Sequence, residues 1–430
     1  MSPVPAARVR NSSSATAKPP KFGRMSVNLP PMGELYPVPG VRLASCGAAI
    51  KKADRDDVAL LVFTPGTTLA GVFTQSGFRA PPVDLAEQRI AAGTVRALLI
   101  NSGNANAATG VEGLEDAQHL CAQAASALGL EDQAVAPFST GVIGERLPVE
   151  KIAGAIDTCA GQLDPDSWAA VAGAIMTTDT APKALSEVVE IDGVQVTITG
   201  IAKGSGMIKP DMATMLAYLC CDAAVTAPCL QQMVRAVADA SFNRITIDGD
   251  TSTNDSFVLA ATGVAGNVLI DDVCSPAYQT LQESLVRVAQ WLAQSVVRDG
   301  EGATKFVTVA VSGGASEAEC LQVAYTVAES PLVKTALFAS DPNWGRFCMA
   351  IGRAGLVDLD QSRVSVFLDK LCIVQQGRQH PDYQEADGAS VMANDELTIR
   401  IELGRGAACA EVWTSDLSYE YVRINAEYRT

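Results

Sequence analysis

Residues 200–222 read GIAKGSGMIKPDMATMLAYLCCD, a glycine-rich loop that includes Pro210 and is followed by an apolar run. The apolar run at 215–221, MLAYLCC, carries no charge and predicts a strand buried on both faces. Thr214 stands where the loop becomes the strand, a position at which α/β proteins commonly place their chemistry. The first question is therefore whether Thr214 is a nucleophile or only a β-branched residue that begins a strand.

The composition restricts the partners that this chain can have. Its 430 residues carry a formal net charge of −16, which argues against a nucleic acid or an anionic membrane surface as a partner. No apolar run approaches the roughly 20 residues of a membrane span. Residues 1–24 are basic and contain no acid, but they lack the apolar core of a secretory signal. We interpret them as a disordered tail or an over-extended start before Met25, in preference to an organellar presequence.

The cysteines indicate a reducing compartment. There are eleven of them, an odd number, and none forms a CxxC pair. They are therefore expected to be reduced core residues of a cytoplasmic protein, with no zinc cluster and no other metal site.

Alternating strand and helix patterns predict a layered α/β architecture. Asp192-Gly193 between two apolar segments predicts a hairpin, and residues 340–346 predict a compact turn. The strands are expected at 58–63, 95–100, 134–138, 188–191, 194–198, 245–247, 257–259, 306–311, 364–368, 397–403 and 409–414, and the helices at 114–128, 148–158, 166–176, 226–240, 276–297 and 315–328.

Several short motifs are candidates for a site. Residues 101–106 (NSGNAN) either bind an oxygen-rich ligand or form a turn whose asparagines satisfy their own backbone. Thr140 and Gly141 follow a strand and have the residue types of an oxyanion hole. Glu301, between two glycines, is hard to explain as packing, and the aromatic residues near the C-terminus predict that this end docks.

Other chemistries find little support. The two histidines, His119 and His380, have no nucleophile motif near them, so we interpret both as non-catalytic. No phosphate loop, GxGxxG motif or GxSxG elbow is present. What remains is a hydroxyl nucleophile without histidine. A cut between Ala213 and Thr214 would give Thr214 a free α-amino group, whose pKa near 7.7–8.0 allows it to act as a base.

A set of motifs then identifies a family. The chain contains STGVIGE (139–145), MTTDT (176–180), KGSGMIKPDMATML (203–216), SFNRITIDGDTSTNDS (241–256), DGEGATK (299–305), DPNWGR (341–346) and YVRINAEY (421–428). In this combination and order the sequence resembles the ornithine acetyltransferase family, the glutamate N-acetyltransferases of arginine biosynthesis. The resemblance covers nearly the whole chain from about residue 30.

The resemblance implies a role for each matching residue. Self-cleavage between Ala213 and Thr214 would make Thr214 the acyl-accepting nucleophile. Thr140 and Gly141 would form the oxyanion hole. The family's substrate-contacting positions fall, together with Thr214 itself, on Thr177, Lys203, Glu301, Asn425 and Thr430.

The resemblance also implies a fold and a reaction. The fold would be an αββα sandwich that is similar to N-terminal nucleophile hydrolases but differently connected. An α chain (25–213) and a β chain (214–430) would assemble as an α2β2 heterotetramer. The acetyl group would pass from N2-acetyl-L-ornithine to Thr214 and then to L-glutamate in a ping-pong cycle, without a cofactor.

Three alternatives remain open from the sequence. It does not distinguish an enzyme that uses only acetylornithine from a bifunctional one that also takes acetyl-CoA as a co-substrate. A self-processing aminopeptidase or amidohydrolase of similar architecture would use water as the acceptor. A non-catalytic amino-acid-binding protein would keep the fold and never cleave.

Overall fold

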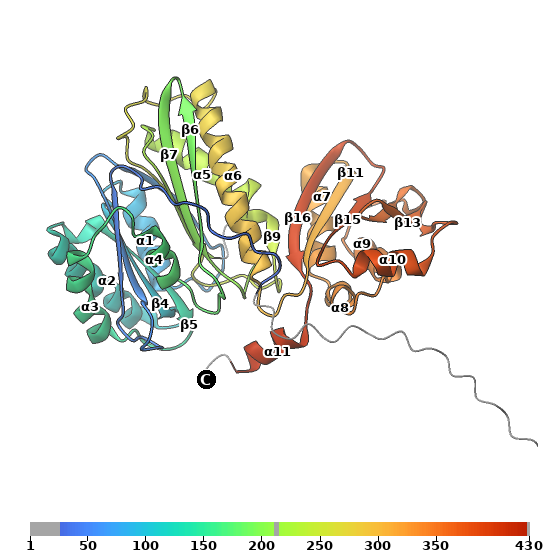
Figure 1. Cartoon of the computed structure of the whole chain (residues 1–430), viewed down its shortest axis with the longest axis horizontal. Helices are drawn as coiled ribbons and strands as arrows, with labels where there is room; N and C mark the ends of the chain where they lie inside the picture. The colour runs from blue at the N-terminus through green and yellow to red at the C-terminus, as the bar shows by residue number, and fades with distance from the viewer. Residues whose placement is uncertain (1–25, 210–214, 428–430) are drawn as a thin grey trace, which may run out of the picture.

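The computed structural model describes residues 26–209 and 215–427, and these form two lobes (Figure 1). The predicted tail at 1–24, the predicted cleavage site at Ala213 and Thr214, and Thr430 lie outside the described residues. The larger lobe contains two sheets and the smaller lobe is built on a third (Figure 1).

The first sheet of the larger lobe has four strands in the order β1-β2-β4-β5. β4 and β5 run parallel, and the other neighbours are antiparallel. The strands are β1 (Val41–Cys46), β2 (Val58–Phe63), β4 (Ala97–Asn104) and β5 (Val135–Val142).

The second sheet has five strands in the order β3-β10-β8-β7-β6. β8 lies between a parallel β10 and an antiparallel β7. The strands are β3 (Thr68–Phe73), β6 (Lys183–Ile191), β7 (Val194–Lys203), β8 (Leu216–Cys221) and β10 (Ser256–Ala261).

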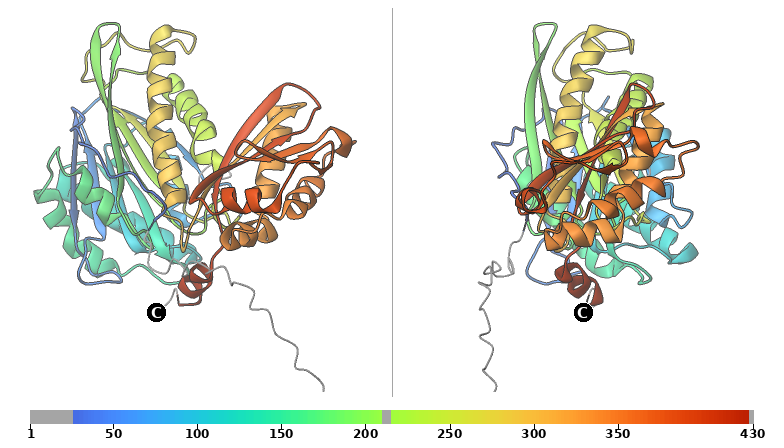
Figure 2. Two further views of the ribbon diagram at one scale, coloured as in Figure 1. Left: turned by 45° about the vertical axis from the view of Figure 1, so that its right-hand side comes forward. Right: turned by 90° about the vertical axis from the view of Figure 1, so that its right-hand side faces the viewer.

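These two sheets pack face to face with helices outside each of them (Figures 1 and 2). α2 (Gly110–Leu128) and α3 (Val149–Gly161) cover the first sheet. α5 (Ala227–Ala240) and α6 (Pro276–Arg298) cover the second. The αββα prediction is therefore confirmed. Two shorter helices, α1 (Pro81–Ala91) and α4 (Trp168–Ala174), complete this lobe.

The strand β8 confirms the interpretation of the apolar run. All six of its residues are buried. Because side chains alternate along a strand, Tyr218 enters the core between the sheets, whereas Leu219 packs toward α5 and α6. The ring of Tyr218 contacts the ring of Phe138, a residue of the first sheet. The two rings pack edge to face, with 5.3 Å between their centroids. Both faces of the central strand β8 are therefore covered, which explains why its side chains are apolar on both sides.

The smaller lobe is a seven-stranded sheet in the order β14-β13-β12-β15-β11-β16-β9, with helices packed against it. Its strands are β9 (Ile245–Thr246), β11 (Phe306–Gly314), β12 (Ser365–Leu368), β13 (Leu371–Gln375), β14 (Arg378–Gln379), β15 (Glu396–Glu402) and β16 (Ala408–Ser415). The later helices are α7 (Glu317–Ala328), α8 (Pro331–Ala339), α9 (Trp344–Gly352), α10 (Glu385–Met392) and α11 (Tyr419–Ala426).

One sequence prediction in this lobe is wrong in part. The compact turn expected at 340–346 ends early, because α9 begins at Trp344. The turn residues Asp341 and Asn343 lie just before the helix, where Asn343 is the capping position. The turn-forming residues therefore mark the start of a helix.

Two further properties follow from the structure. All eleven cysteines lie in the described part, and each is a free thiol. Over residues 26–209 and 215–427, none of the helices is long and apolar enough to cross a membrane.

Candidate active site

Six of the predicted site residues line one cavity of about 130 Å³ in the larger lobe. They come from segments far apart in the sequence and are Thr140, Gly141, Thr177, Lys203, Glu301 and Asn425. Met215, the residue that follows Thr214 in the sequence, also lines the cavity. The structure thus brings together every predicted site residue that it describes.

Thr140 and Gly141 lie near the end of β5, beside the parallel β4. Gly141 has φ of +135°, and a Cβ there would lie 2.2 Å from the carbonyl carbon of Gly103. Only glycine fits this close contact between two strand ends. Thr140 Oγ1 accepts a hydrogen bond from the amine of Lys203 at 3.2 Å. Because its oxygen is the acceptor, its own O–H remains available to donate into the cavity.

Lys203 ends β7 and is almost fully buried. Burial disfavours the charged amine and lowers the pKa of Lys203, although the carboxylates of Asp179, Asp255 and Glu301 oppose this shift. These three acidic side chains lie near the amine of Lys203 and favour its charged form. The amine of Lys203 nevertheless lies within hydrogen-bonding distance of Thr140, which is predicted to belong to the oxyanion hole.

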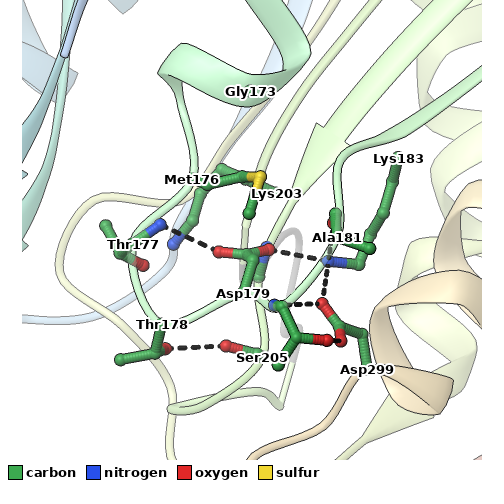
Figure 3. A network of polar contacts seen from close by, with 12 residues as sticks. Gly173, Met176, Thr177, Thr178, Asp179, Ala181, Lys183, Lys203, Ser205 and Asp299 are labelled. Carbon is green, nitrogen blue, oxygen red and sulfur yellow. Dashed lines mark hydrogen bonds and ion pairs between the residues drawn. The ribbon is translucent and has the colours of Figure 1, made fainter. Parts of the chain in front are cut away.

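Asp179 holds in place the two segments that carry Thr177 and Lys203, as Figure 3 shows. Its carboxylate accepts the N–H of Thr177 at 2.9 Å and the N–H of Gly204, next to Lys203, at 2.7 Å. Burial opposes ionisation of Asp179, but the charges of Lys183 and Lys203 and the hydrogen bonds that it accepts outweigh burial and lower its pKa. Asp179 therefore stays ionised and fixes the backbone of both segments.

A buried ion network supports Asp179 from behind (Figure 3). Lys183 donates to Asp179 at 2.8 Å and to Asp299 at 2.6 Å, and all three side chains are fully buried. Asp299 also accepts the N–H of Thr180 at 2.9 Å. The network ties β6 and the end of α6 to the MTTDT segment, so it positions the site without lining the cavity.

Glu301 and Asn425 close another side of the cavity. The amide of Asn425 donates to the Glu301 carboxylate at 2.7 Å. Gly206 allows this carboxylate to approach, because a Cβ on Gly206 would lie 2.5 Å from Glu301 Oε2. Asn425 is on α11, which docks through Ser418 to the carbonyl of Gly302 at 2.7 Å. The prediction that the C-terminal segment docks is therefore confirmed through residue 427.

The sequence analysis missed Asp255, which also lines the cavity. It directly precedes β10, whose first residue, Ser256, donates its N–H to the carbonyl of Met215 at 2.9 Å. Asp255 is 3% exposed, and among the described residues its Oδ2 atom has no hydrogen-bond partner. Burial raises its pKa well above the ordinary value, although Ser252 and Lys203 oppose the shift. Burial of this carboxyl group therefore favours its protonated form.

Asn254, also missed, connects the two sheets at the cavity. Its amide donates to the carbonyl of Ala105 at 2.6 Å and to that of Ser139 at 2.9 Å. Both acceptors belong to the first sheet or the loop that follows it, whereas Asn254 leads into β10 of the second. This amide therefore holds β5, which carries Thr140 and Gly141, against the strand pair β8 and β10. The signal in the sequence was its place in the motif SFNRITIDGDTSTNDS (241–256), to which no role had been assigned.

The structure also shows where two other features of the sequence lie. In the NSGNAN segment, residues 101–104 are the end of β4, and Asn101 and Asn106 donate their amides to the carbonyls of Asn104 and Gly113. Ala105 of the same segment lines the cavity. His119 lies exposed on α2, and His380 lies in a loop of the smaller lobe. Neither lines the cavity.

Comparisons with known proteins agree with the sequence motifs. A family model, described as the ArgJ family, matches residues 42–430. The chain is 54% identical over 406 residues to the arginine biosynthesis bifunctional protein ArgJ of Pseudomonas syringae pv. tomato, covering 94% of this chain and 100% of that protein. It is 52% identical to the protein of that name from Pseudomonas fluorescens, with the same coverage. A crystal structure of arginine biosynthesis bifunctional protein argJ from Bacillus halodurans is 36% identical, with a TM-score of 0.45, and covers 48% of this chain and 95% of that chain.

Proposed function

The chain belongs to the ArgJ family, and from this membership we propose that it transfers the acetyl group of N2-acetyl-L-ornithine to L-glutamate in arginine biosynthesis. One observation carries the proposal. Six residues expected from the family motifs lie around a single cavity next to Met215, the sequence neighbour of the proposed nucleophile. A pathway of soluble amino-acid substrates, together with free cysteine thiols, supports a cytoplasmic location.

The proposed catalyst arises by self-cleavage between Ala213 and Thr214. The hydroxyl of Thr214 attacks the acetyl carbonyl and gives its proton to the new α-amino group. The developing oxyanion accepts hydrogen bonds from the hydroxyl of Thr140 and the N–H of Gly141. The bond from the acetyl carbon to the ornithine nitrogen then breaks, and the α-ammonium returns the proton to the leaving amine.

The second half of the cycle regenerates the enzyme. The amine of glutamate attacks the acetyl ester on Thr214, and the same oxyanion hole stabilises the tetrahedral intermediate. The α-amino group of Thr214 accepts the proton that glutamate loses, and this proton returns to the threonine oxygen as the ester breaks. N-acetylglutamate leaves.

The charged residues of the cavity have separate roles in substrate binding. Lys203 supplies positive charge for the α-carboxylate that both substrates carry, which a chain of net charge −16 must provide locally. Glu301, held by Asn425, receives the side-chain ammonium of acetylornithine. Asp255, whose pKa is raised by burial, donates a hydrogen bond into the cavity from beside Lys203 in its protonated form. Thr177 and Thr430 complete the proposed set of substrate contacts.

The assembly proposed is an α2β2 heterotetramer of cleaved chains. β7 precedes the cut and β8 follows it, and the two strands pair from Lys203 with Leu216 to Ile198 with Cys221. Because this pairing runs through the centre of a sheet, the two chains should remain associated after cleavage. Acetyl-CoA is a second acetyl donor in this proposal, consistent with the word bifunctional in the relatives' name.

A steady-state assay separates transfer from the alternative functions. Acetylornithine is supplied with and without glutamate, and N-acetylglutamate, ornithine and acetate are measured. We expect N-acetylglutamate and ornithine to form in equal amounts only when glutamate is present. Acetate release independent of glutamate would instead identify a hydrolase, and substrate binding without any product would identify a non-catalytic binding protein.

A further inference from the structure

A second cavity, of about 280 Å³, adjoins the proposed active site. The two cavities share Gly141, Thr177 and Thr178 in their linings. The two cavities therefore lie next to each other at Gly141, one of the two residues of the proposed oxyanion hole. No role in the proposed reaction has yet been given to the residues that line only the second one.

Three cationic side chains line this second cavity, namely Lys51, Lys52 and Arg55. Both lysines are exposed at its mouth. Arg55 is anchored deeper, because its Nη2 atom donates to the carbonyls of Ala174 at 3.2 Å and Met176 at 2.5 Å. Arg55 thereby joins this lining to the segment that carries Thr177.

The acidic groups in the same lining already have partners. The carboxylate of Asp57 accepts the backbone N–H groups of Ala48 and Ile50, each at 2.6 Å, and so shapes the loop that carries the lysines. Glu427 is 3.3 Å from the guanidinium of Arg423 on α11. Three cationic and two acidic side chains thus line this cavity, whereas one cationic and two acidic side chains, including the buried Glu301, line the first.

The two substrates of the proposed reaction require such a pair of cavities. Acetylornithine and glutamate share an α-carboxylate, but the ornithine side chain ends in an ammonium and the glutamate side chain ends in a carboxylate. A carboxylate placed beside the buried Glu301 would face a like charge in a poorly solvated site. One cavity that suits the first side chain therefore repels the second.

We propose that the cavity lined by Lys51, Lys52 and Arg55 is the acceptor subsite, which receives the side-chain carboxylate of glutamate during the second half-reaction. This inference rests on the proposed function and adds to it the basis of acceptor selection. Donor and acceptor share the oxyanion hole and Lys203. They differ in the cavity that their side chains enter.

The test separates the two half-reactions in the purified, processed enzyme carrying Lys51→Gln, Lys52→Gln or both. Acetylation of the enzyme by acetylornithine without acceptor is followed by mass. Deacetylation is then measured with glutamate and with glutamine, a neutral analogue of the same shape. We expect the double variant to keep the wild-type acetylation rate and KM for acetylornithine. Its KM for glutamate rises about tenfold, because the side-chain carboxylate loses both lysine charges, and its preference for glutamate over glutamine falls by a similar factor.

A matched control is Lys370→Gln, which removes the same charge from the exposed turn between β12 and β13 and should change none of these constants. An unchanged KM for glutamate in the double variant would overturn the proposal. So would an equal rise in the KM for acetylornithine, or a rise confined to acetyl-CoA, which would assign the cavity to the phosphates of a thioester donor. Failure of the proposed function itself would be recognised separately, because the wild-type enzyme would then not become acetylated.

Discussion

The amine of Lys203 donates a hydrogen bond to the hydroxyl oxygen of Thr140, over 3.2 Å. The two residues lie at the ends of β7 and β5, which belong to different sheets of the sandwich. This contact orients the threonine so that its proton points away from the lysine and is free to meet a developing oxyanion. The packing of the two sheets against each other therefore positions Thr140 for its proposed role in the oxyanion hole.

Replacing Thr140 tests this arrangement. Thr140→Ala should lower kcat by about 10²–10³, because one oxyanion donor is lost from a preorganised site. The KM for acetylornithine should change little, since the donor acts mainly on the transition state. Initial rates over a range of acetylornithine concentrations measure both constants. A wild-type kcat would remove Thr140 from this role.

Gly206 should matter for substrate binding more than for folding. In Gly206→Ala the new Cβ would lie 2.5 Å from Glu301 Oε2, so the flexible end of the glutamate side chain has to move. We expect a raised KM for acetylornithine with a nearly unchanged melting temperature. Gly141→Ala is the contrasting variant, because its Cβ would meet backbone and its φ is positive. If both substitutions lowered the melting temperature equally, Gly206 would have a structural role only.

The ion network behind Asp179 should make a large contribution to stability. Lys183→Met leaves Asp179 and Asp299 buried without their shared cation, which should cost about 3–5 kcal/mol of unfolding free energy. The shift of the denaturation midpoint in urea at neutral pH measures this cost. Lys370→Gln, on the surface, serves as the control. A shift no larger than that of the control would contradict the assigned role.

The same network predicts how stability depends on acid. The pKa of Asp179 is lower in the folded than in the unfolded state, so its stabilisation is present above the unfolded value near 3.9 and is lost as the pH falls toward the folded value. In Asp179→Asn this contribution is absent at every pH. Melting temperatures of the two proteins should therefore converge as the pH falls below about 4. A constant difference would show that Asp179 does not titrate in this way.

Asp255 should show the opposite pH dependence. Its folded pKa is raised, so the folded state holds a proton that the unfolded state releases above about 3.9, and stability falls as the pH rises from there toward the folded value. Asp255→Asn should lose activity. The melting temperature of this variant, relative to that of the wild type at the same pH, should be higher at pH 8 than at pH 4. Thermal scans at both pH values decide this. Full activity in the variant would remove Asp255 from the proposed hydrogen bond into the cavity.

The sequence predicted the fold where apolar periodicity was strong and where family motifs applied. β2 was placed with correct limits, and the buried strand β8 was predicted to within one residue, because six consecutive buried positions leave little ambiguity. Thr140, Lys203 and Glu301 were predicted from motifs, and the structure brings them together. The strands of the seven-stranded sheet were partly predicted, but their grouping into a second lobe was not, since pairing order depends on contacts distant in sequence.

The residues that were missed owe their roles to partners far away in the chain. Lys183 and Asp299 are 116 positions apart, and the sequence around each of them does not predict a buried ion pair. Asp255 sits in a loop of many polar residues, and only its burial beside the cavity distinguishes it from its neighbours. Arg55 likewise has no local pattern that distinguishes it from a surface residue. Its position is fixed by a hydrogen bond to the carbonyl of Ala174 at the end of α4. These roles depend on burial in the folded protein, which a short stretch of sequence does not reveal.

The central claim is that Thr214, freed by cleavage after Ala213, carries the acetyl group. Mass spectrometry of the purified protein after brief exposure to acetylornithine without glutamate tests it most directly. We predict two chains under denaturing conditions, with the second beginning at Thr214 and heavier by one acetyl group on that residue, and loss of this group when glutamate is added. A single uncleaved species of 44.8 kDa, or two chains of which neither gains an acetyl group, would contradict the account.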